Sequence, residues 1–96
     1  MGMDERRAVT VRITGKVQGV WYRGWTVEQA RRRGLDGWVR NLSDGSVEAV
    51  FAGPPPDVDA MLDACWQGPP SAMVINVKVL ETEDTGVTGF DQRPSA

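Results

Sequence analysis

Two hydrophobic periods alternate along this chain, and the order in which they occur leaves few folds open. Residues 8–14 alternate strictly, with Val9, Val11 and Ile13 on one side, which is typical of a half-buried strand. Residues 58–66 instead place apolar side chains at the spacing of one helix face, a pattern that predicts a strongly amphipathic helix. The members of this stripe are Val58, Met61, Leu62, Cys65 and Trp66.

The remaining elements follow from turn residues and from weaker patterns. A helix is expected over residues 22–33, ended by Gly34 in a left-handed cap, with Tyr22, Thr26 and Ala30 on one face. Asp44-Gly45 predicts a hairpin turn between strands at 37–42 and 47–52. A strand is expected over residues 72–81, with its alternate apolar residues on one face, and a short last strand near residues 90–93. The apolar residues of that longer strand are Met73, Ile75, Val77 and Val79.

The order strand, helix, strand, strand, helix, strand predicts one α+β domain over residues 1–96. Such a βαββαβ chain forms an antiparallel sheet of four to five strands, with both helices on one face. The termini, at residues 1–6 and 94–96, are expected to be flexible. No stretch has the composition of a linker or an internal repeat.

The composition excludes several kinds of site. The chain has no histidine and one cysteine, so it can form no Ser-His-Asp triad, no His-ligated zinc site and no internal disulfide. Cys65 lies on the apolar helix stripe, where a buried, unreactive thiol is expected. We find no secretory signal, no myristoylation pattern and no apolar run long enough for a membrane span, so a cytoplasmic location is expected.

The charge is unevenly distributed. The net charge is −2, which argues against a general nucleic-acid binder, yet residues 1–43 sum to +5 and residues 44–96 to −7. A site built from the first half would favour a small anion. The alternative is that the two charged regions are merely solvated surfaces.

The connection after the first strand is the strongest candidate for an anion site. Gly15 and Gly19 allow backbone N–H groups to converge, and a helix N-terminus follows them. Arg23 falls in the first helical turn, where the helix dipole disfavours a cation, and its planar fork could bind two oxygens of a phosphate. The plainer alternative is a glycine turn beside a solvated arginine.

Asn41 is the second candidate, because asparagine is disfavoured in strands. It could simply start the hairpin turn. Its carboxamide could equally orient a water molecule, since it both donates and accepts hydrogen bonds.

Together these segments resemble the two signatures of the acylphosphatase family. The first match is Gly15-x-Val17-Gln18-Gly19-Val20-x-Tyr22-Arg23. The second is Gly37-Trp38-Val39-Arg40-Asn41-x-x-x-Gly45-x-Val47, followed by Gly53. Gly68-Pro69 and Gly89-Phe90 extend the resemblance over nearly the whole chain, with mild departures at Lys16, Trp21 and the prolines after Gly53.

The resemblance implies a ferredoxin-like fold and a metal-free enzyme that hydrolyses small acyl phosphates to a carboxylate and inorganic phosphate. By similarity, Arg23 binds the phosphoryl group and Asn41 positions the attacking water. The backbone cradle for the phosphate comprises Gly15, Val17, Gln18, Gly19, Val20, Trp21 and Tyr22. The resemblance implies no cofactor, and a monomer acting on a small molecule, without nucleic acid or membrane, is expected.

Two other functions remain open on the residues alone. A small RNA-binding domain could have the same architecture, although residues 47–51 lack the aromatic pattern that stacks bases. A regulatory domain could bind phosphate in the same cradle with negligible turnover. The sequence does not distinguish among acetyl, carbamoyl and other acyl phosphates as the physiological substrate.

Overall fold

The expected order of strands and helices is confirmed in residues 5–96, the part of the chain that the computed structural model describes. Residues 1–4, part of the N-terminal segment expected to be flexible, lie outside the described residues. The helices are α1 (Tyr22–Arg32) and α2 (Pro55–Gln67). The strands are β1 (Arg7–Lys16), β2 (Asp36–Asn41), β3 (Val47–Gly53), β4 (Met73–Glu81) and β5 (Phe90–Gln92).

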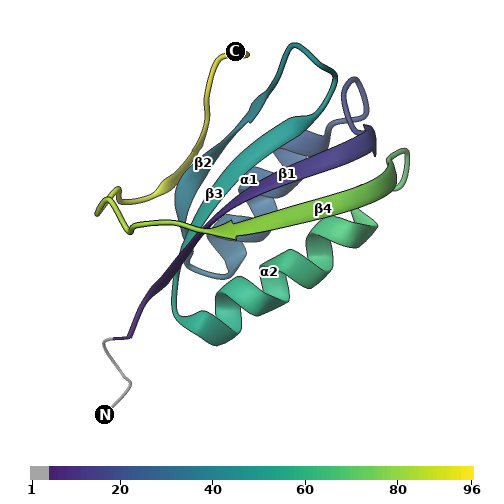
Figure 1. Ribbon diagram of the computed structural model, residues 1–96. Coiled ribbons are helices and arrows are strands. Elements are labelled where there is room, and N and C mark those ends of the chain that lie inside the picture. Colours follow the sequence, from purple (N-terminus) through teal and green to yellow (C-terminus); the bar gives the residue numbers. More distant parts are fainter. Residues whose placement is uncertain (1–4) are drawn as a thin grey trace.

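The strands form one sheet in the order β4-β1-β3-β2-β5, and both helices cover the same face of it (Figure 1). The expectation of a purely antiparallel sheet is wrong, because β5 pairs parallel to β2. The reason lies in where β4 ends. Glu81 pairs with Val9, so the chain leaves β4 at the end of the sheet where β2 begins. After crossing that end, the chain enters the far edge beside the start of β2 and runs in the same direction.

The core lies between the sheet and the helices. The three α1 positions expected on one face, Tyr22, Thr26 and Ala30, are all buried. On α2, Val58, Met61 and Cys65 are buried, while Trp66 is 50% exposed. The expectation that Trp66 belongs to the buried stripe is therefore wrong. It follows Cys65 by one residue, which rotates it about 100° around the helix, to the margin of the apolar face.

The expectation that alternate residues of β4 face inward from its first residue is also wrong. Val77 is buried, but Met73 and Ile75 are exposed, and Val74 packs against the core instead. The pairing of β1 with β4 shifts between Thr14 and Gly15, and this bulge reverses which side chains face inward. Gly15 has φ +123°, and a Cβ there would collide with the Met73 backbone, so only glycine permits this close approach.

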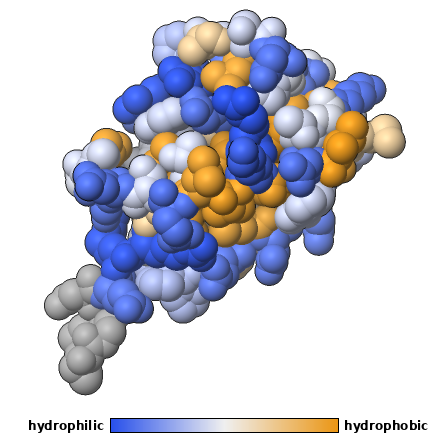
Figure 2. Space-filling view, viewed as in Figure 1, coloured by the Kyte–Doolittle hydropathy of each residue, from blue (hydrophilic) through white to orange (hydrophobic). Residues whose placement is uncertain are grey.

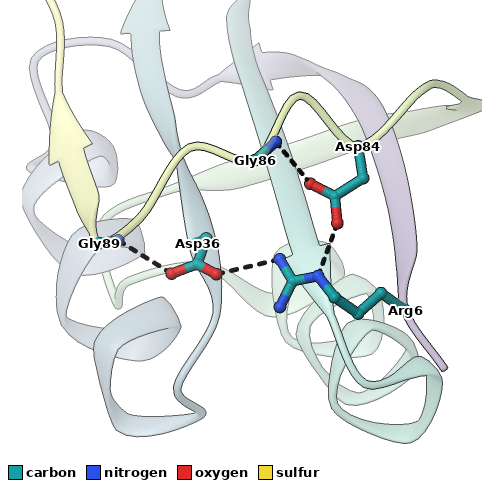
Figure 3. Close-up of polar contacts among 5 residues, drawn as sticks. All are labelled: Arg6, Asp36, Asp84, Gly86 and Gly89. Carbon is teal, nitrogen blue, oxygen red and sulfur yellow. Dashed lines mark hydrogen bonds and ion pairs between the residues drawn. The ribbon is translucent and has the colours of Figure 1, made fainter. Parts of the chain in front are cut away.

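A cluster of polar contacts attaches the short strand β5 to the sheet (Figure 3). The Asp36 carboxylate accepts a hydrogen bond from the Gly89 N–H at 2.9 Å and one from the Arg6 guanidinium at 3.0 Å. Arg6 also donates to Asp84 at 2.6 Å, which lowers the pKa of that carboxyl, with a further contribution from the Gly86 N–H. The cluster therefore joins the start of β2 to the loop that leads into β5.

The other face of the sheet is open to solvent. Figure 2 shows a patch of hydrophobic residues surrounded by hydrophilic ones on this side of the molecule. Leu80 and Ile75 are exposed on β4. On β2, the guanidinium groups of Arg40 and Arg93 lie over the Trp38 ring, 5.0 and 4.8 Å from its centroid. Among residues 5–96, neither helix has the length and hydrophobicity that a membrane crossing requires.

We predict that Asp36→Ala lowers the free energy of unfolding by about 1–2 kcal/mol, because it removes one charge-assisted hydrogen bond and one backbone hydrogen bond. Urea denaturation followed by fluorescence measures this change. Asp91→Ala is the matched control, because Asp91 lies on β5, is exposed and makes only a 3.4 Å contact to Arg31, so its cost should stay below about 0.5 kcal/mol. Equal unfolding free energies for the two variants would contradict this assignment.

Candidate functional site

Most of the residues singled out in the sequence line one pocket of about 150 Å³. A pocket of this size suits a small polar group, since sites for larger ligands usually exceed about 300 Å³. Gly15 and Val20 are not among its lining residues: Gly15 pairs with Val74 in the sheet, and Val20 packs against the core. The lining residues are Val17, Gln18, Gly19, Trp21, Tyr22, Arg23, Gly24, Asn41 and Gln92.

The loop between β1 and α1 offers unused backbone donors to this pocket. Residues 17–21 belong to no strand or helix, and their N–H groups donate to no other protein group among residues 5–96. Gly19 has φ +74°, a left-handed conformation that glycine adopts readily. The N-terminus of α1 follows at once and adds a partial positive charge. The loop can therefore bind an anion through several backbone N–H groups.

Arg23 stands beside these donors with a guanidinium that no acidic side chain neutralises. It forms no ion pair within the described residues, and the first turn of α1 contains no acidic residue. A cation at a helix N-terminus is opposed by the helix dipole. An anion bound in the pocket would relieve this repulsion and would accept two hydrogen bonds from the guanidinium.

Asn41 lines the pocket on the side of the sheet. It is the last residue of β2 and pairs with Val47 of β3, and its own backbone oxygen accepts a hydrogen bond from the Ala96 N–H at 2.9 Å. The Asn41 side-chain Oδ1 is buried without a hydrogen-bond partner, alone in this respect among the described residues. A buried acceptor without a partner is unfavourable, so a water or ligand donor in the pocket would stabilise it.

Gln18 joins the loop to the hairpin that follows Asn41. Its Nε2 donates to the backbone oxygens of Leu42 and Ser46, at 2.9 and 2.8 Å. The hairpin itself is closed by the Leu42 N–H, which donates to the Ser46 oxygen, and by Asp44, whose carboxyl pKa is lowered by the Ser46 hydroxyl. These contacts hold the anion-binding loop at a set distance from Asn41.

The sequence reasoning did not find two of the lining residues, Gly24 and Gln92. Gln92 reaches the pocket only because β5 runs parallel to β2, with Gln92 opposite Val39. No spacing in the sequence indicates that pairing. Gly24 had a weak signal, since glycine inside a helix is unfavourable and often has a packing reason.

Two buried ionisable side chains, Tyr22 and Cys65, supply no reactive anion to the pocket. Burial raises the pKa of the Tyr22 phenol, whose hydroxyl donates to the Cys65 backbone oxygen at 2.7 Å. Burial also raises the pKa of the Cys65 thiol to about 12, so the thiolate nucleophile is not populated near neutral pH. The expectation of a buried thiol is confirmed. Within residues 5–96, no three carboxylate or thiol groups are grouped as metal ligands.

The arrangement suits one chemical task. Loop N–H groups and a guanidinium can bind the oxygens of a tetrahedral anion, while a carboxamide oxygen opposite them can accept a hydrogen bond from a water. Positioning and charge stabilisation of this kind are the main requirements of phosphoryl transfer.

Comparison with known proteins agrees with this chemistry. A family model described as Acylphosphatase matches residues 9–92. The chain is 57% identical over 89 residues to an acylphosphatase of Rhodospirillum rubrum, covering 93% of this chain and 98% of that one. It is 63% identical over 73 residues to an acylphosphatase of Rhizobium meliloti, covering 76% and 77%.

The fold is likewise similar to solved structures. An acylphosphatase from Coxiella burnetii superposes with a TM-score of 0.90 at 36% identity, covering 94% of this chain and 95% of that one. An acylphosphatase from Bacillus subtilis superposes with a TM-score of 0.89 at 31% identity, covering 91% of this chain and 98% of that one.

We predict that Gln18→Ala weakens the binding of inorganic phosphate about tenfold, because two hydrogen bonds that order the loop are lost. Calorimetric titration with phosphate measures the dissociation constant. Gln67→Ala is the control, since Gln67 is an exposed glutamine at the end of α2 and outside the pocket. An unchanged phosphate affinity in folded Gln18→Ala would show that the loop does not depend on this tie.

Proposed function

Since the chain belongs to the acylphosphatase family, we propose that Arg23 binds the phosphoryl group of its substrate and that Asn41 orients the attacking water. The enzyme hydrolyses the bond between carboxyl and phosphoryl groups in acyl phosphates. The single observation that best supports the residue roles is their common pocket, in which an unneutralised guanidinium and an unpartnered carboxamide oxygen lie with free N–H groups.

The proposed reaction is a direct displacement at phosphorus. The water oxygen attacks phosphorus while the bond from phosphorus to the acyl oxygen breaks, and that electron pair leaves with the carboxylate. The water proton passes to a phosphoryl oxygen. Because a carboxylate is a stable anion, its departure needs no general acid, and a loose transition state makes little demand on a general base. The reaction therefore requires no histidine.

Arg23 and the loop supply the charge stabilisation in this proposal. The N–H groups of the loop residues that line the pocket and the Arg23 fork face phosphoryl oxygens whose charge changes during transfer, and they are placed before the reaction begins. Arginine suits this role better than lysine, because its planar fork binds two oxygens together. The binding of a dianion also offsets the repulsion between Arg23 and the dipole of α1.

Asn41 acts on the nucleophile. A water that donates one hydrogen to the buried Oδ1 has its lone pairs directed away from Asn41, toward the phosphoryl group held by the loop. Holding the water in this orientation lowers the entropic barrier to attack. The carboxamide does not need to remove a proton in this scheme.

We extend the proposal to the setting in which the enzyme works. Residues 1–96 are proposed to form one domain that acts as a monomer on small-molecule acyl phosphates, without a metal, a nucleic acid or a membrane. The net charge of −2 and a lone buried cysteine support this view and a reducing, cytoplasmic location. Turnover unchanged by excess chelator, and a single monomer peak in sedimentation, are the expected results.

Substitutions at the two side chains should affect different kinetic constants. We predict that Arg23→Ala lowers kcat/KM by about 10²–10⁴-fold, with a higher KM, because binding of the phosphoryl group is lost along with transition-state stabilisation. Asn41→Ala should lower kcat by about 10²–10³-fold with little change in KM, because the water and not the phosphate is affected. Steady-state assays with acetyl phosphate and benzoyl phosphate measure both.

Arg12→Ala and Asn76→Ala are the matched controls, since both residues are exposed on the open side of the sheet and outside the pocket. Both should keep wild-type kinetics. Near wild-type turnover in folded Arg23→Ala and Asn41→Ala would show that the reaction takes place elsewhere.

The pH dependence should follow the substrate and not the protein. The Tyr22 phenol has a raised pKa and stays neutral, the Cys65 thiol has a pKa of about 12, and histidine is absent. We predict that kcat/KM changes by less than about twofold between about pH 6.5 and 8.5, for a substrate whose phosphoryl charge is constant over that range. A sigmoidal step in that range, measured in stopped-flow or steady-state assays, would reveal an ionising protein group that the pocket does not explain.

A further inference from the structure

Trp21 has an unusual backbone for a residue with a large side chain. It has φ 67° and ψ 23°, and it is alone among the non-glycine residues of 5–96 in having a positive φ. The left-handed conformation is disfavoured for side chains other than those of glycine, asparagine and aspartate. Such outliers persist where the surrounding structure requires them, and they are often found at functional sites.

The Trp21 side chain packs against Gly24. A Cβ at position 24 would overlap the Trp21 indole, around its Nε1 atom, so the ring lies directly on the glycine. Glycine inside a helix is unfavourable, and Gly24 lies in the first turn of α1. Two locally unfavourable features, a left-handed tryptophan and a helical glycine, thus have one common result. They place the indole against the start of α1, at the rim of the pocket.

The indole is the apolar surface that a bound substrate can reach. Trp21 is 58% exposed, whereas the other large apolar side chains that line the pocket, Val17 and Tyr22, are each 1% exposed. The remaining lining residues are glycines or have polar side chains. An acyl phosphate with its phosphoryl group on the loop must direct its acyl group away from the loop N–H groups, toward the rim. An acyl group larger than acetyl therefore meets the indole there.

We propose that Trp21 is a specificity-determining residue, whose indole binds the acyl part of the substrate and favours flat aromatic acyl groups over acetyl. This inference rests on the proposed function, in which the loop and Arg23 bind the phosphoryl group. The substrate class is then an acyl phosphate with an aromatic or extended planar acyl group. Stacking of such a group on the indole adds dispersion contacts that a methyl group is too small to make.

The test compares two substrates in matched variants. Trp21→Gly removes the indole and suits the left-handed backbone, so the loop keeps its path. We expect the ratio of kcat/KM for benzoyl phosphate to that for acetyl phosphate to fall about three- to tenfold. Trp21→Phe should retain part of the ratio. Gly24→Ala should lower it as well, because the added methyl displaces the indole, although alanine is the better helix former.

Trp66→Ala is the control. Trp66 is also half exposed, but it lies on α2 and not in the pocket. The ratio of kcat/KM for benzoyl phosphate to that for acetyl phosphate in Trp66→Ala should therefore equal that of the wild type. An unchanged ratio in Trp21→Gly and Gly24→Ala, with turnover that still depends on Arg23 and Asn41, would overturn this inference and leave the proposed function intact. Turnover independent of Arg23 and Asn41 would overturn the proposed site, and this inference with it.

Discussion

The register of β3 between β1 and β2 determines where the groups that line the pocket lie. Val47 of β3 pairs with Ile13 of β1 on one side and with Asn41 of β2 on the other. Asn41 is thereby level with the point where β1 nears its end and leads into the anion-binding loop. A slip of one residue would turn Asn41 to the open face of the sheet, and a slip of two would move it by about 7 Å. Gln18 then secures the loop to the same hairpin, so the pocket is a direct product of strand pairing.

The site gathers residues that are unfavourable for the local structure around them. Arg23 lies against a helix dipole, Asn41 stands in a strand with an unpartnered oxygen, and Trp21 has a left-handed backbone. Elsewhere the local preferences agree with the fold: α1 has arginines in its last turn, and Gly45 supplies the positive φ of the hairpin turn. Local inconsistency confined to one pocket is what a functional site produces, because binding and catalysis there outweigh local stability. In the proposed mechanism the same pocket lets an enzyme work without histidine, since its donors are backbone N–H groups and a guanidinium, and the Asn41 carboxamide oxygen accepts a hydrogen bond from the water.

The sequence predicted most elements because their signals are local. Alternation in residues 8–14, the stripe that begins at Val58 and the Asp44-Gly45 turn each depend on neighbours in the chain. The sequence predictions were wrong where the structure of a segment depends on contacts with a distant part of the chain. The direction of β5 depends on where β4 ends, and the exposure of Met73 depends on a bulge opposite Gly15. Gln92 was missed for the same reason, because only the parallel pairing with Val39 brings it to the pocket.

By itself, the sequence determined the order of elements, the family resemblance and the two side chains on which the proposed chemistry depends. These follow from residue type and spacing, which are written in the chain. Only the tertiary structure decided which groups share a pocket, that the Oδ1 of Asn41 is buried without a partner, and that the Trp21 indole rests on Gly24 at the rim. The physical reason is that burial, strand register and the packing of one side chain on another are set by segments far apart in the chain, and no local pattern records them.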